Sequence, residues 1–315
     1  MPCPLCRADR FEPWLTAVPR FGSLEPSRFN IERCVDCGLL QTRPAPSPEE
    51  LGEAYGAAYT WKSNPGLVSR LESLYRQLLV RCDQARSVRF AARLAPGTNL
   101  LDIGCGDGLL IAEARRAGLL AFGVDRPGAP LWPACDPAWR SVGDIEALEH
   151  PADRWDIVSL FQVAEHLRDP LSLLTKIHRW LKPGGVLVLQ VPNAASVQAR
   201  LLQRRWSAFD VPRHLVHWTP TTLRRALEQT QYDVAAIRYM SLRDNGPALM
   251  SSLFPGLDPL VDRERTLGRP ARSAAALALR RFFYLGLVWS LMPLTLVEAA
   301  AHASACITAF ARKRG

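Results

Sequence analysis

The sequence predicts an α/β protein, built as a doubly wound, mostly parallel sheet of seven strands with helices on both faces. From Asn99 onward, short apolar stretches alternate with helical patterns, which is typical of a parallel sheet covered on both sides. In the stretch Asn99–Gly108, a short apolar run is followed by Asp102, and glycines then occupy alternate positions. A strand, a tight turn and a helix start of this kind bring a nucleotide-type ligand to backbone N–H groups. The composition allows a large core, because 48% of the residues are hydrophobic and 22% are charged.

The other core elements follow in order along the chain. The helix after the glycine turn covers about Leu109–Ala117 and ends at Gly118. A later helix ends near Leu181 at a Lys-Pro-Gly-Gly turn, and Thr219-Pro220 supplies the N-cap and the first-turn proline of another. After Asn99–Asp102, the expected strands are Leu119–Val124, a third strand at Val142 before Gly143-Asp144-Ile145, Trp155–Phe161 as the fourth, Val186–Val191, Tyr232–Met240 and Ala305–Lys313.

The residue types in the turn restrict the class of ligand that it can bind. Gly104, Gly106 and Gly108 suit a turn that needs positive φ and a close approach of ligand to backbone. A carboxylate such as Asp102 has no use in a pyrophosphate-binding turn, whereas it stabilises a ligand that carries an ammonium and a sulfonium. Asp125 ends the second strand 23 residues later, where an acid can accept hydrogen bonds from both ribose hydroxyls. A surface aspartate before the Arg126-Pro127-Gly128 turn is the alternative interpretation.

Four features stand in an order and spacing that resemble class I S-adenosylmethionine (SAM) dependent methyltransferases. They are the D-x-G-x-G-x-G run, the ribose acid, Glu165-His166 after the fourth strand, and the Leu-Lys-Pro-Gly-Gly turn. The resemblance covers about Asn99–Val191 and implies a Rossmann-like core with SAM as cofactor and an antiparallel final strand pair. It also implies an adenine contact from Asp144 and its apolar neighbour Ile145. The predicted cofactor-binding residues are Asp102, Gly104, Cys105, Gly106, Asp125, Arg126, Asp144, Ile145, Phe161 and Gln162.

Methyl transfer often requires that a base remove a proton from the acceptor. The candidates are Glu165 and His166 after the fourth strand, and His214 and His217 in a presumed substrate loop. A capping or core histidine is the alternative for each. In ubiquinone-type O-methyltransferases the corresponding place resembles Glu-x-x-Glu-His and binds a divalent metal. Gln162 stands at the first of these positions, which argues against a metal there.

Two cysteine pairs near the N-terminus predict a structural zinc site. Cys3 and Cys6 form one C-x2-C knuckle, Cys34 and Cys37 form the other, and 27 residues lie between them. Four thiolates complete a tetrahedral zinc ion and leave no position for water. We expect a zinc-ribbon-like region at residues 1–43, with strands around Phe11–Leu15 and Phe29–Arg33. Together with the core, it resembles C-methyltransferases that act on nucleotide-linked deoxysugars.

Two further regions complete the expected organisation. Residues 44–95 are predicted as a proline-rich linker with an aromatic patch (Tyr55, Tyr59, Trp61) and an amphipathic helix, and residues 96–315 as the SAM-binding domain. About 241–304 is an apolar helical insertion in which Phe282–Val297 carry no charge. This uncharged run is shorter than the ~20 residues of a membrane span. Peripheral membrane contact through 282–297, or burial against the core or a second copy, both remain open.

The leading hypothesis is methyl transfer to an O or C atom of a small molecule, saccharide- or lipid-linked among the options. The formal charge of +9 and the zinc knuckles keep an RNA methyltransferase as the alternative, although nucleic acid is the less favoured partner. A membrane-surface scaffold with a non-catalytic core is the alternative from another class. The N-terminus lacks the pattern of a secretory signal, so we expect a cytoplasmic protein, or one at the inner face of the membrane.

Overall fold

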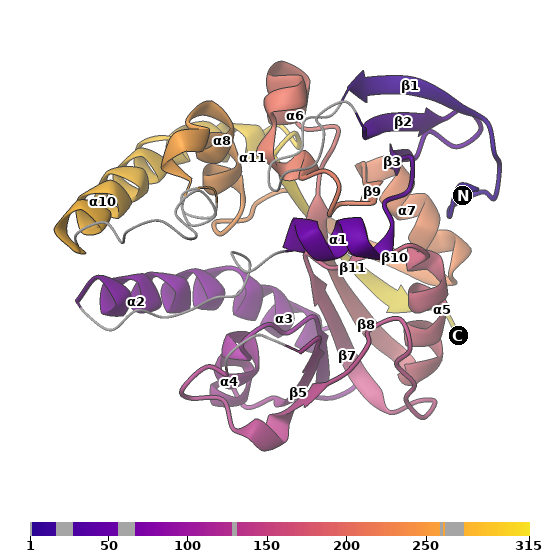
Figure 1. Ribbon diagram of the computed structural model, residues 1–315. Coiled ribbons are helices and arrows are strands. Elements are labelled where there is room, and N and C mark those ends of the chain that lie inside the picture. Colours follow the sequence, from indigo (N-terminus) through magenta and orange to yellow (C-terminus); the bar gives the residue numbers. More distant parts are fainter. Residues whose placement is uncertain (1, 17–27, 56–66, 128–130, 259–260, 262–273) are drawn as a thin grey trace. The chain divides into compact units, whose positions relative to one another are not determined.

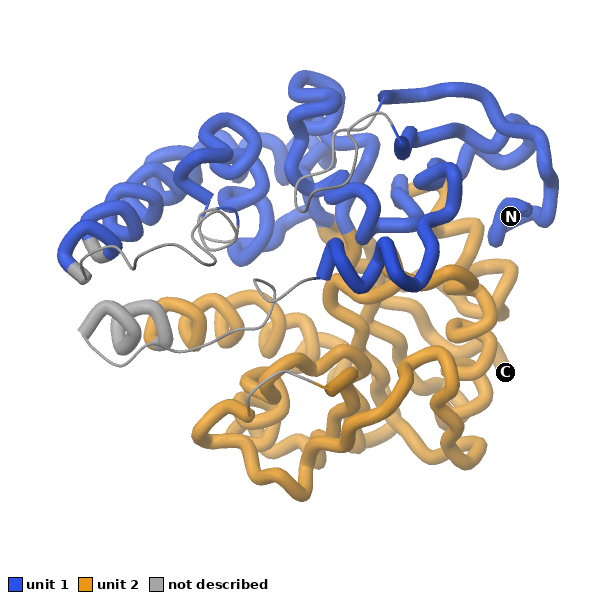
Figure 2. The backbone as a smooth tube through the Cα atoms, viewed as in Figure 1, with its two compact units in different colours: residues 1–61, 192–219, 239–306 blue, residues 62–191, 220–238, 307–315 orange. Residues whose placement is uncertain are grey.

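The computed structural model describes residues 2–16, 28–55, 67–127, 131–258, 261 and 274–315. The chain divides into two compact units, each assembled from three stretches of sequence (Figure 2). Unit 1 contains residues 1–61, 192–219 and 239–306, and unit 2 contains residues 62–191, 220–238 and 307–315. This division differs from the three consecutive regions that we expected. Tyr59 and Trp61 of the expected aromatic patch lie outside the described residues.

Unit 2 is built around a seven-stranded sheet in the order β10-β11-β8-β7-β4-β5-β6 (Figure 1). The strands from β8 to β6 run parallel, and β10 pairs antiparallel with β11. This confirms the predicted fold class. The strands are β4 (Asn99–Ile103), β5 (Leu120–Asp125), β6 (Arg140–Val142), β7 (Trp155–Phe161), β8 (Leu181–Pro192), β10 (Tyr232–Arg238) and β11 (Cys306–Lys313).

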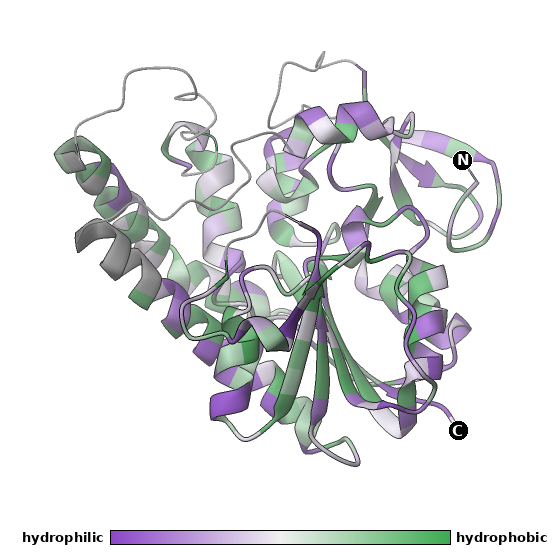
Figure 3. Cartoon of the chain, turned by 60° about the horizontal axis from the view of Figure 1, so that its bottom comes forward, coloured by the Kyte–Doolittle hydropathy of each residue, from purple (hydrophilic) through white to green (hydrophobic). Residues whose placement is uncertain are grey.

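Helices cover both faces of this sheet, as its apolar strands require. Every residue of β7 is buried, and the strands of the sheet are coloured mostly as hydrophobic in Figure 3. On one face, the buried core joins apolar residues of α3 and α4 to the strands, and α5 and α7 lie on the other face (Figure 1). The helices of unit 2 are α2 (Leu67–Cys82), α3 (Gln84–Ala92), α4 (Leu109–Arg116), α5 (Pro170–Trp180) and α7 (Pro220–Gln229), with short 3-10 turns at η1 (Pro137–Trp139) and η2 (Ala164–His166).

The Lys-Pro-Gly-Gly stretch is a bulge inside β8 rather than a turn that precedes the strand. Leu181 pairs with Trp155, but the next pair along the two strands joins Val186 to Ile157, so residues 182–185 bulge opposite Asp156. Gly184 has φ of 72° there. The bulge lets Lys182 Nζ reach the buried carboxylate of Asp156, 3.0 Å from its Oδ1. At the same edge, Asp156 Oδ2 accepts a 3.0 Å hydrogen bond from the backbone N–H of Asn99.

Unit 1 combines an antiparallel sheet with a group of helices. The sheet has the order β1-β2-β3-β9, from β1 (Phe11–Thr16), β2 (Asn30–Cys34), β3 (Leu40–Arg43) and β9 (Val216–His217). The first two strands confirm the strands predicted in the zinc region. Because Leu40 pairs with His217, the segment after residue 192 completes the N-terminal sheet, which explains the interleaved units. The helices are α1 (Pro48–Tyr55), α6 (Val197–Leu202), α8 (Asn245–Leu253), α10 (Ala274–Ser290) and α11 (Met292–Ala300), with 3-10 turns η3 (Gln203–Arg205), η4 (Ser207–Phe209) and η5 (Pro255–Leu257).

Candidate functional site

The candidate cofactor site lies where the strand order of unit 2 reverses. From β4 the chain moves outward to β5 and β6, and then returns to place β7 on the other side of β4. Ligands of open α/β sheets bind at the carboxyl ends of the strands at such a switch point. The glycine turn follows β4, and Glu165 and His166 follow β7, so both segments belong to this edge of the sheet.

The three glycines of the turn all have positive φ, but they face different surroundings. A Cβ on Gly104 would lie 2.3 Å from Val163 Cγ2, and one on Gly108 would lie 2.5 Å from Cys135 Sγ. These two glycines therefore permit close packing within the protein. A Cβ on Gly106, where φ is 58°, would meet no atom within 4 Å. Gly106 thus presents backbone to open space, as a cofactor cradle requires.

Asp102 is held at the end of β4 by the neighbouring strand. Its carboxylate is buried, and Oδ1 accepts a 2.7 Å hydrogen bond from the hydroxyl of Ser159, its register partner on β7. Between Asp102 and Gly106, Cys105 is also buried. Burial, and then the charges of Asp102 and Asp125, raise the pKa of the Cys105 thiol, so this side chain stays protonated. The two carboxylates therefore make the turn electronegative.

Asp125 ends β5 and connects it to the glycine turn. One carboxylate oxygen accepts a hydrogen bond from the N–H of Gly106, and the other accepts one of 2.6 Å from the N–H of Arg126. The Arg126 side chain is exposed. The N–H of Gly104 bonds to the carbonyl of Val124 at 2.8 Å, which fixes the turn to the same strand. The ribose acid predicted from the sequence thus lies directly against the open glycine.

The other predicted cofactor residues follow the neighbouring strands. Ile145 is buried after β6, while Asp144 is exposed and its Oδ1 accepts a 3.1 Å hydrogen bond from the N–H of Glu146. Phe161 is buried at the end of β7. Gln162 has φ of 60°, and its N–H donates to the carbonyl of Gln190 at 3.0 Å. Each residue stands at the carboxyl edge of the sheet, and its contact with a cofactor stays a prediction.

The four candidate catalytic residues are divided between the units. Glu165 and His166 form η2 in unit 2, where Glu165 is buried and His166 is half-buried. The N–H of His166 bonds to the carbonyl of Val163, the residue that packs on Gly104. This short helix is therefore fixed next to the glycine turn. His214 and His217 belong to unit 1.

The hydrogen bonds of the two histidines in unit 1 define their tautomers. Thr42 Oγ1 donates to the carbonyl of His214 at 2.6 Å, so it accepts the N–H of His217 Nε2 at 3.0 Å. Burial lowers the pKa of His217 to about 3, against the opposing charge of Asp210. A buried imidazole with this pKa is a weak base, so the structure favours a structural role for His217. His214 Nδ1 donates to the carbonyl of Ala208 at 2.9 Å, which leaves Nε2 as its basic nitrogen.

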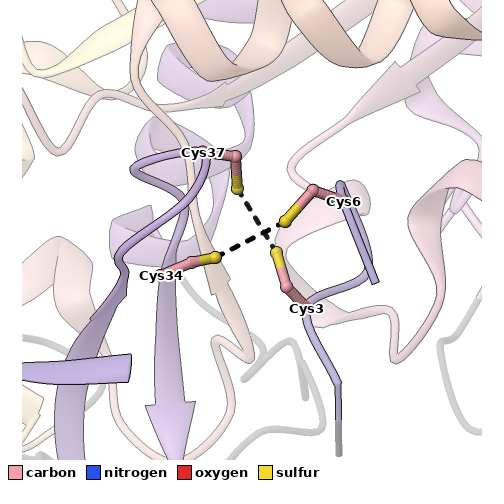
Figure 4. A group of neighbouring side chains, drawn as sticks. All are labelled: Cys3, Cys6, Cys34 and Cys37. Carbon is pink, nitrogen blue, oxygen red and sulfur yellow. Dashed lines mark hydrogen bonds between the residues drawn. The ribbon is translucent and has the colours of Figure 1, made fainter. Parts of the chain in front are cut away.

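The four N-terminal cysteines converge on one point (Figure 4). Cys3 Sγ lies 3.4 Å from Cys37 Sγ, Cys6 Sγ lies 3.5 Å from Cys34 Sγ, and all four sulfurs lie within 4.8 Å of one another. Zn–S bonds of about 2.3 Å place tetrahedral sulfurs about 3.8 Å apart. All four are free thiols. The donor set therefore fits a zinc ion.

The apolar C-terminal segment forms a longer helical run than its uncharged stretch suggested. α10 and α11 follow each other with only Leu291 between them. Ala275–Ala300 is, by length and composition alone, the single helical stretch among the described residues that meets the criteria for a membrane span, and 28% of its most apolar window is buried. The uncharged stretch Phe282–Val297 is shorter than this run because it begins after the charged Arg281.

Two residues of the candidate site were missed in the sequence. Ser159 is an ordinary member of an apolar strand, yet it supplies the donor for Asp102. Its register opposite Asp102 is the signal that would have identified it, but register is set by strand pairing rather than by local sequence. Val163 is the second, because its side chain fills the space that the missing Cβ of Gly104 leaves.

The fold and this geometry define an α/β protein with a glycine turn next to two carboxylates, at the switch point of a doubly wound sheet. A family model described as a methyltransferase domain matches residues 75–237. The chain therefore belongs to the methyltransferase-domain family, within the class I SAM-dependent methyltransferases.

Individual relatives and solved structures are similar to parts of the chain. The chain is similar to a ubiquinone biosynthesis O-methyltransferase of Ruegeria pomeroyi, with 34% identity over 46% of this chain and 66% of that protein. A protein of the same name from Cereibacter sphaeroides is 30% identical over 48% of this chain and 63% of its own length. The match thus spans about two thirds or less of these relatives. A solved SAM-dependent methyltransferase from Archaeoglobus fulgidus is 19% identical, with a TM-score of 0.47 over 79% of this chain and all of that one.

Proposed function

We propose that this protein transfers a methyl group from SAM to a hydroxyl oxygen of a small molecule. The observation that carries the proposal is the arrangement around Gly106, whose open backbone bonds to the carboxylate of Asp125 and follows the buried carboxylate of Asp102 in the same turn. Asp102 suits the cationic amino acid end of SAM, and Asp125 is placed to accept hydrogen bonds from ribose hydroxyls. Membership of the methyltransferase family supports the cofactor, and the names of the relatives support oxygen as the acceptor.

The proposed reaction is an in-line displacement. SAM supplies an electrophilic methyl group: the acceptor oxygen forms a bond to its carbon as the carbon–sulfur bond breaks, and sulfur keeps the electron pair. The protein must hold the acceptor in line and take up the hydroxyl proton. Within unit 2, His166 is the residue that we propose for this proton. It is half-buried, whereas its neighbour Glu165 is 1% exposed.

The acceptor that the relatives suggest is a phenolic hydroxyl of a quinone-type ring. The N-terminal cysteine cluster favours a second candidate, the C-methylation of a nucleotide-linked sugar, because the sequence of the zinc region resembles that of sugar C-methyltransferases. The relatives do not favour an RNA acceptor. We also propose that the four thiolates bind one structural zinc ion, since they leave no open position for water.

Calorimetric titration with SAM tests the cofactor, and labelled methyl transfer to a catechol-type acceptor tests the reaction. We expect the wild type to bind SAM and Asp125→Ala to bind it at least about tenfold more weakly, the effect of one lost charge-assisted hydrogen bond. An absence of SAM binding by the wild type would overturn the proposal. Transfer to a nucleotide-linked sugar but not to the catechol would establish the second candidate instead.

The proposed role of His166 has its own test. Replacing a general base by alanine lowers kcat by about 10²–10⁴ and removes the corresponding limb of the pH profile. We expect His166→Ala to show both effects while its affinity for SAM changes little. The control is His302→Asn, because His302 is exposed and has φ of 55°, a conformation that asparagine tolerates. An unchanged pH profile for His166→Ala would exclude His166 as the base.

A further inference from the structure

The helical run α10–α11 buries several polar side chains and exposes most of its largest apolar side chains. Its buried face includes Tyr284, Val288, Met292, Thr295 and Glu298, which recur every three or four residues along the run. The outer face carries large apolar side chains that are more than half exposed. They include Leu279, Phe282, Phe283, Trp289, Leu296 and Val297, and Phe282 reaches 78% exposure. A helix that faces water on one side normally shows the reverse pattern.

The inner face is held by specific contacts within unit 1. Glu298 is buried and its Oε2 accepts a 2.8 Å hydrogen bond from Gln198 of α6. Tyr284 and Val288 pack on Met250 of α8. Arg280 donates a hydrogen bond to the carbonyl of Gly256. These contacts fix which face of the run points outward, so the exposed apolar surface belongs to the folded unit.

The charges on the run are of one sign outside its buried face. Glu298 is its single carboxylate, and it is buried, whereas Arg280 and Arg281 lie immediately before Phe282. From residue 241 to 315 the chain carries ten basic and five acidic residues. An exposed apolar face with adjacent arginines is complementary to acyl chains and lipid phosphates. In a symmetric dimer a second copy of the same face would offer these arginines no exposed carboxylate, because Glu298 is buried.

We infer that the outer face of α10–α11 docks this protein onto the surface of an anionic lipid bilayer. The run lies along the interface, with its outer apolar side chains among the upper acyl chains and its inner face on α6 and α8. The buried hydrogen bond between Gln198 and Glu298 is kept in this arrangement, whereas insertion across the bilayer would break it and expose both groups to lipid. Docking does not depend on the proposed methyl transfer.

Sedimentation with vesicles tests the docking surface. The full chain should bind vesicles of phosphatidylglycerol and phosphatidylcholine, and bind less well in 0.5 M salt or to phosphatidylcholine alone, on the order of tenfold. Phe282→Ser/Val297→Ser should lower the partition coefficient at least about tenfold, the effect of losing a few kcal/mol of buried apolar area. The control, Val35→Ser/Leu120→Ser, removes two apolar side chains that are about half exposed elsewhere (51% and 53%) and should bind like the wild type.

The position of the bound face is tested with brominated lipids, which quench nearby tryptophans. Quenching of the wild type should exceed that of Trp289→Phe, because Trp289 is 52% exposed on the outer face. Equal vesicle binding by Phe282→Ser/Val297→Ser and by the wild type would overturn the proposal. So would a wild type that leaves the vesicles unbound and forms a dimer, with the double variant monomeric, since the face would then bind a second copy. A SAM titration of the same samples shows separately whether the cofactor site is intact.

Discussion

The hydroxyl of Ser159 donates a 2.7 Å hydrogen bond to Asp102 Oδ1, and both residues are buried at the switch point of the sheet. The bond joins β7 to β4 at the place where the cofactor turn begins. It offsets part of the cost of burying a carboxylate, because a buried charge without donors is strongly unfavourable.

Ser159→Ala should therefore lower the free energy of unfolding by about 1–3 kcal/mol, the cost of leaving a buried polar group without one of its donors. Urea unfolding measures this change. Ser141→Ala is the control, because Ser141 is exposed and bonds to the carbonyl of Gly123 at 3.3 Å. Equal losses in the two variants would show that Asp102 does not depend on Ser159.

The glycine turn allows a comparison of two glycines with the same backbone requirement. Gly106 and Gly118 both have positive φ and open space where a Cβ would lie, but Gly118 only ends α4. Alanine at either position should cost about 1 kcal/mol of stability through backbone strain. Only Gly106→Ala should also weaken SAM binding, by at least about tenfold, because its methyl group occupies the cofactor space. Calorimetry on both variants decides this, and unchanged affinity in Gly106→Ala would place the cofactor elsewhere.

The environment of Glu113 leads us to expect that the protein loses stability at low pH. Burial alone would raise its pKa, but hydrogen bonds from Arg81 and Gln77 and the charge of Arg116 lower it overall. Because the pKa of Glu113 is lower in the folded state, its ionised carboxylate stabilises the fold at pH values above its unfolded-state pKa of about 4.3. This stabilisation is lost as the pH falls through the folded-state pKa. Glu113→Gln should cost about 1–3 kcal/mol at pH 7, since both arginines are about half exposed, and much less below pH 3.

Unfolding curves at pH 7 and pH 3 test this window. Glu228→Gln serves as the control, because its pair with Arg224 is exposed and 4.0 Å long. A Glu113→Gln deficit that is equally large at both pH values would show that the charge of Glu113 is not what stabilises α4 against α2.

For His217 we expect a pH-dependent loss of stability in a different pH range. Its folded-state pKa of about 3 lies below the unfolded value of about 6.5, so the unfolded chain binds a proton first as the pH falls. Stability should fall from about pH 6.5 towards pH 3, at up to about 1.4 kcal/mol per pH unit. His217→Gln keeps an N–H donor for Thr42 but does not titrate, so it should lessen this slope between pH 6.5 and 4.5. Burial also lowers the pKa of His150 and of His178, which account for the slope that is left. If both proteins lose stability equally over that range, His217 is not buried in its neutral form.

The proposed zinc ion can be tested against the other cysteines of the chain. Purified protein should contain about one zinc per chain, and Cys6→Ser/Cys37→Ser should lose it and destabilise unit 1. Cys82→Ser should retain the metal, because Cys82 is exposed and lies outside the cluster. Elemental analysis and thermal unfolding in the presence of a chelator provide the measurements. Wild-type protein that is free of zinc yet insensitive to its addition would refute the site.

The local sequence was sufficient to predict a strand or turn when the residues of that element alone show its pattern. The apolar runs of β4, β7 and β8, and the positive-φ glycines after β4, are such cases, and they were enough for the fold class and the position of the glycine turn. The antiparallel final pair followed from the family resemblance, and β10 and β11 confirm it.

Features that depend on pairing between segments far apart in the sequence could not be predicted from local sequence. The two-residue strand β9 is too short to have a pattern, yet it joins residues near 217 to the N-terminal sheet. The same holds for Ser159, whose role depends on register, and for the Lys-Pro-Gly-Gly bulge, whose lysine bonds to an aspartate 26 residues earlier. Sequence periodicity reports burial within one element, and it contains no information on which element is the partner.

The order of the strands has a consequence for synthesis on the ribosome. β11 follows both β8 and β10 in the sequence, yet it lies between them inside the sheet. The sheet of unit 2 therefore has a gap until Lys313 has left the exit tunnel, and β8 and β10 expose unpaired edges during that time. The nascent chain is thus most exposed to aggregation and to chaperone binding at these two edges after β10 has emerged and before β11 has left the tunnel.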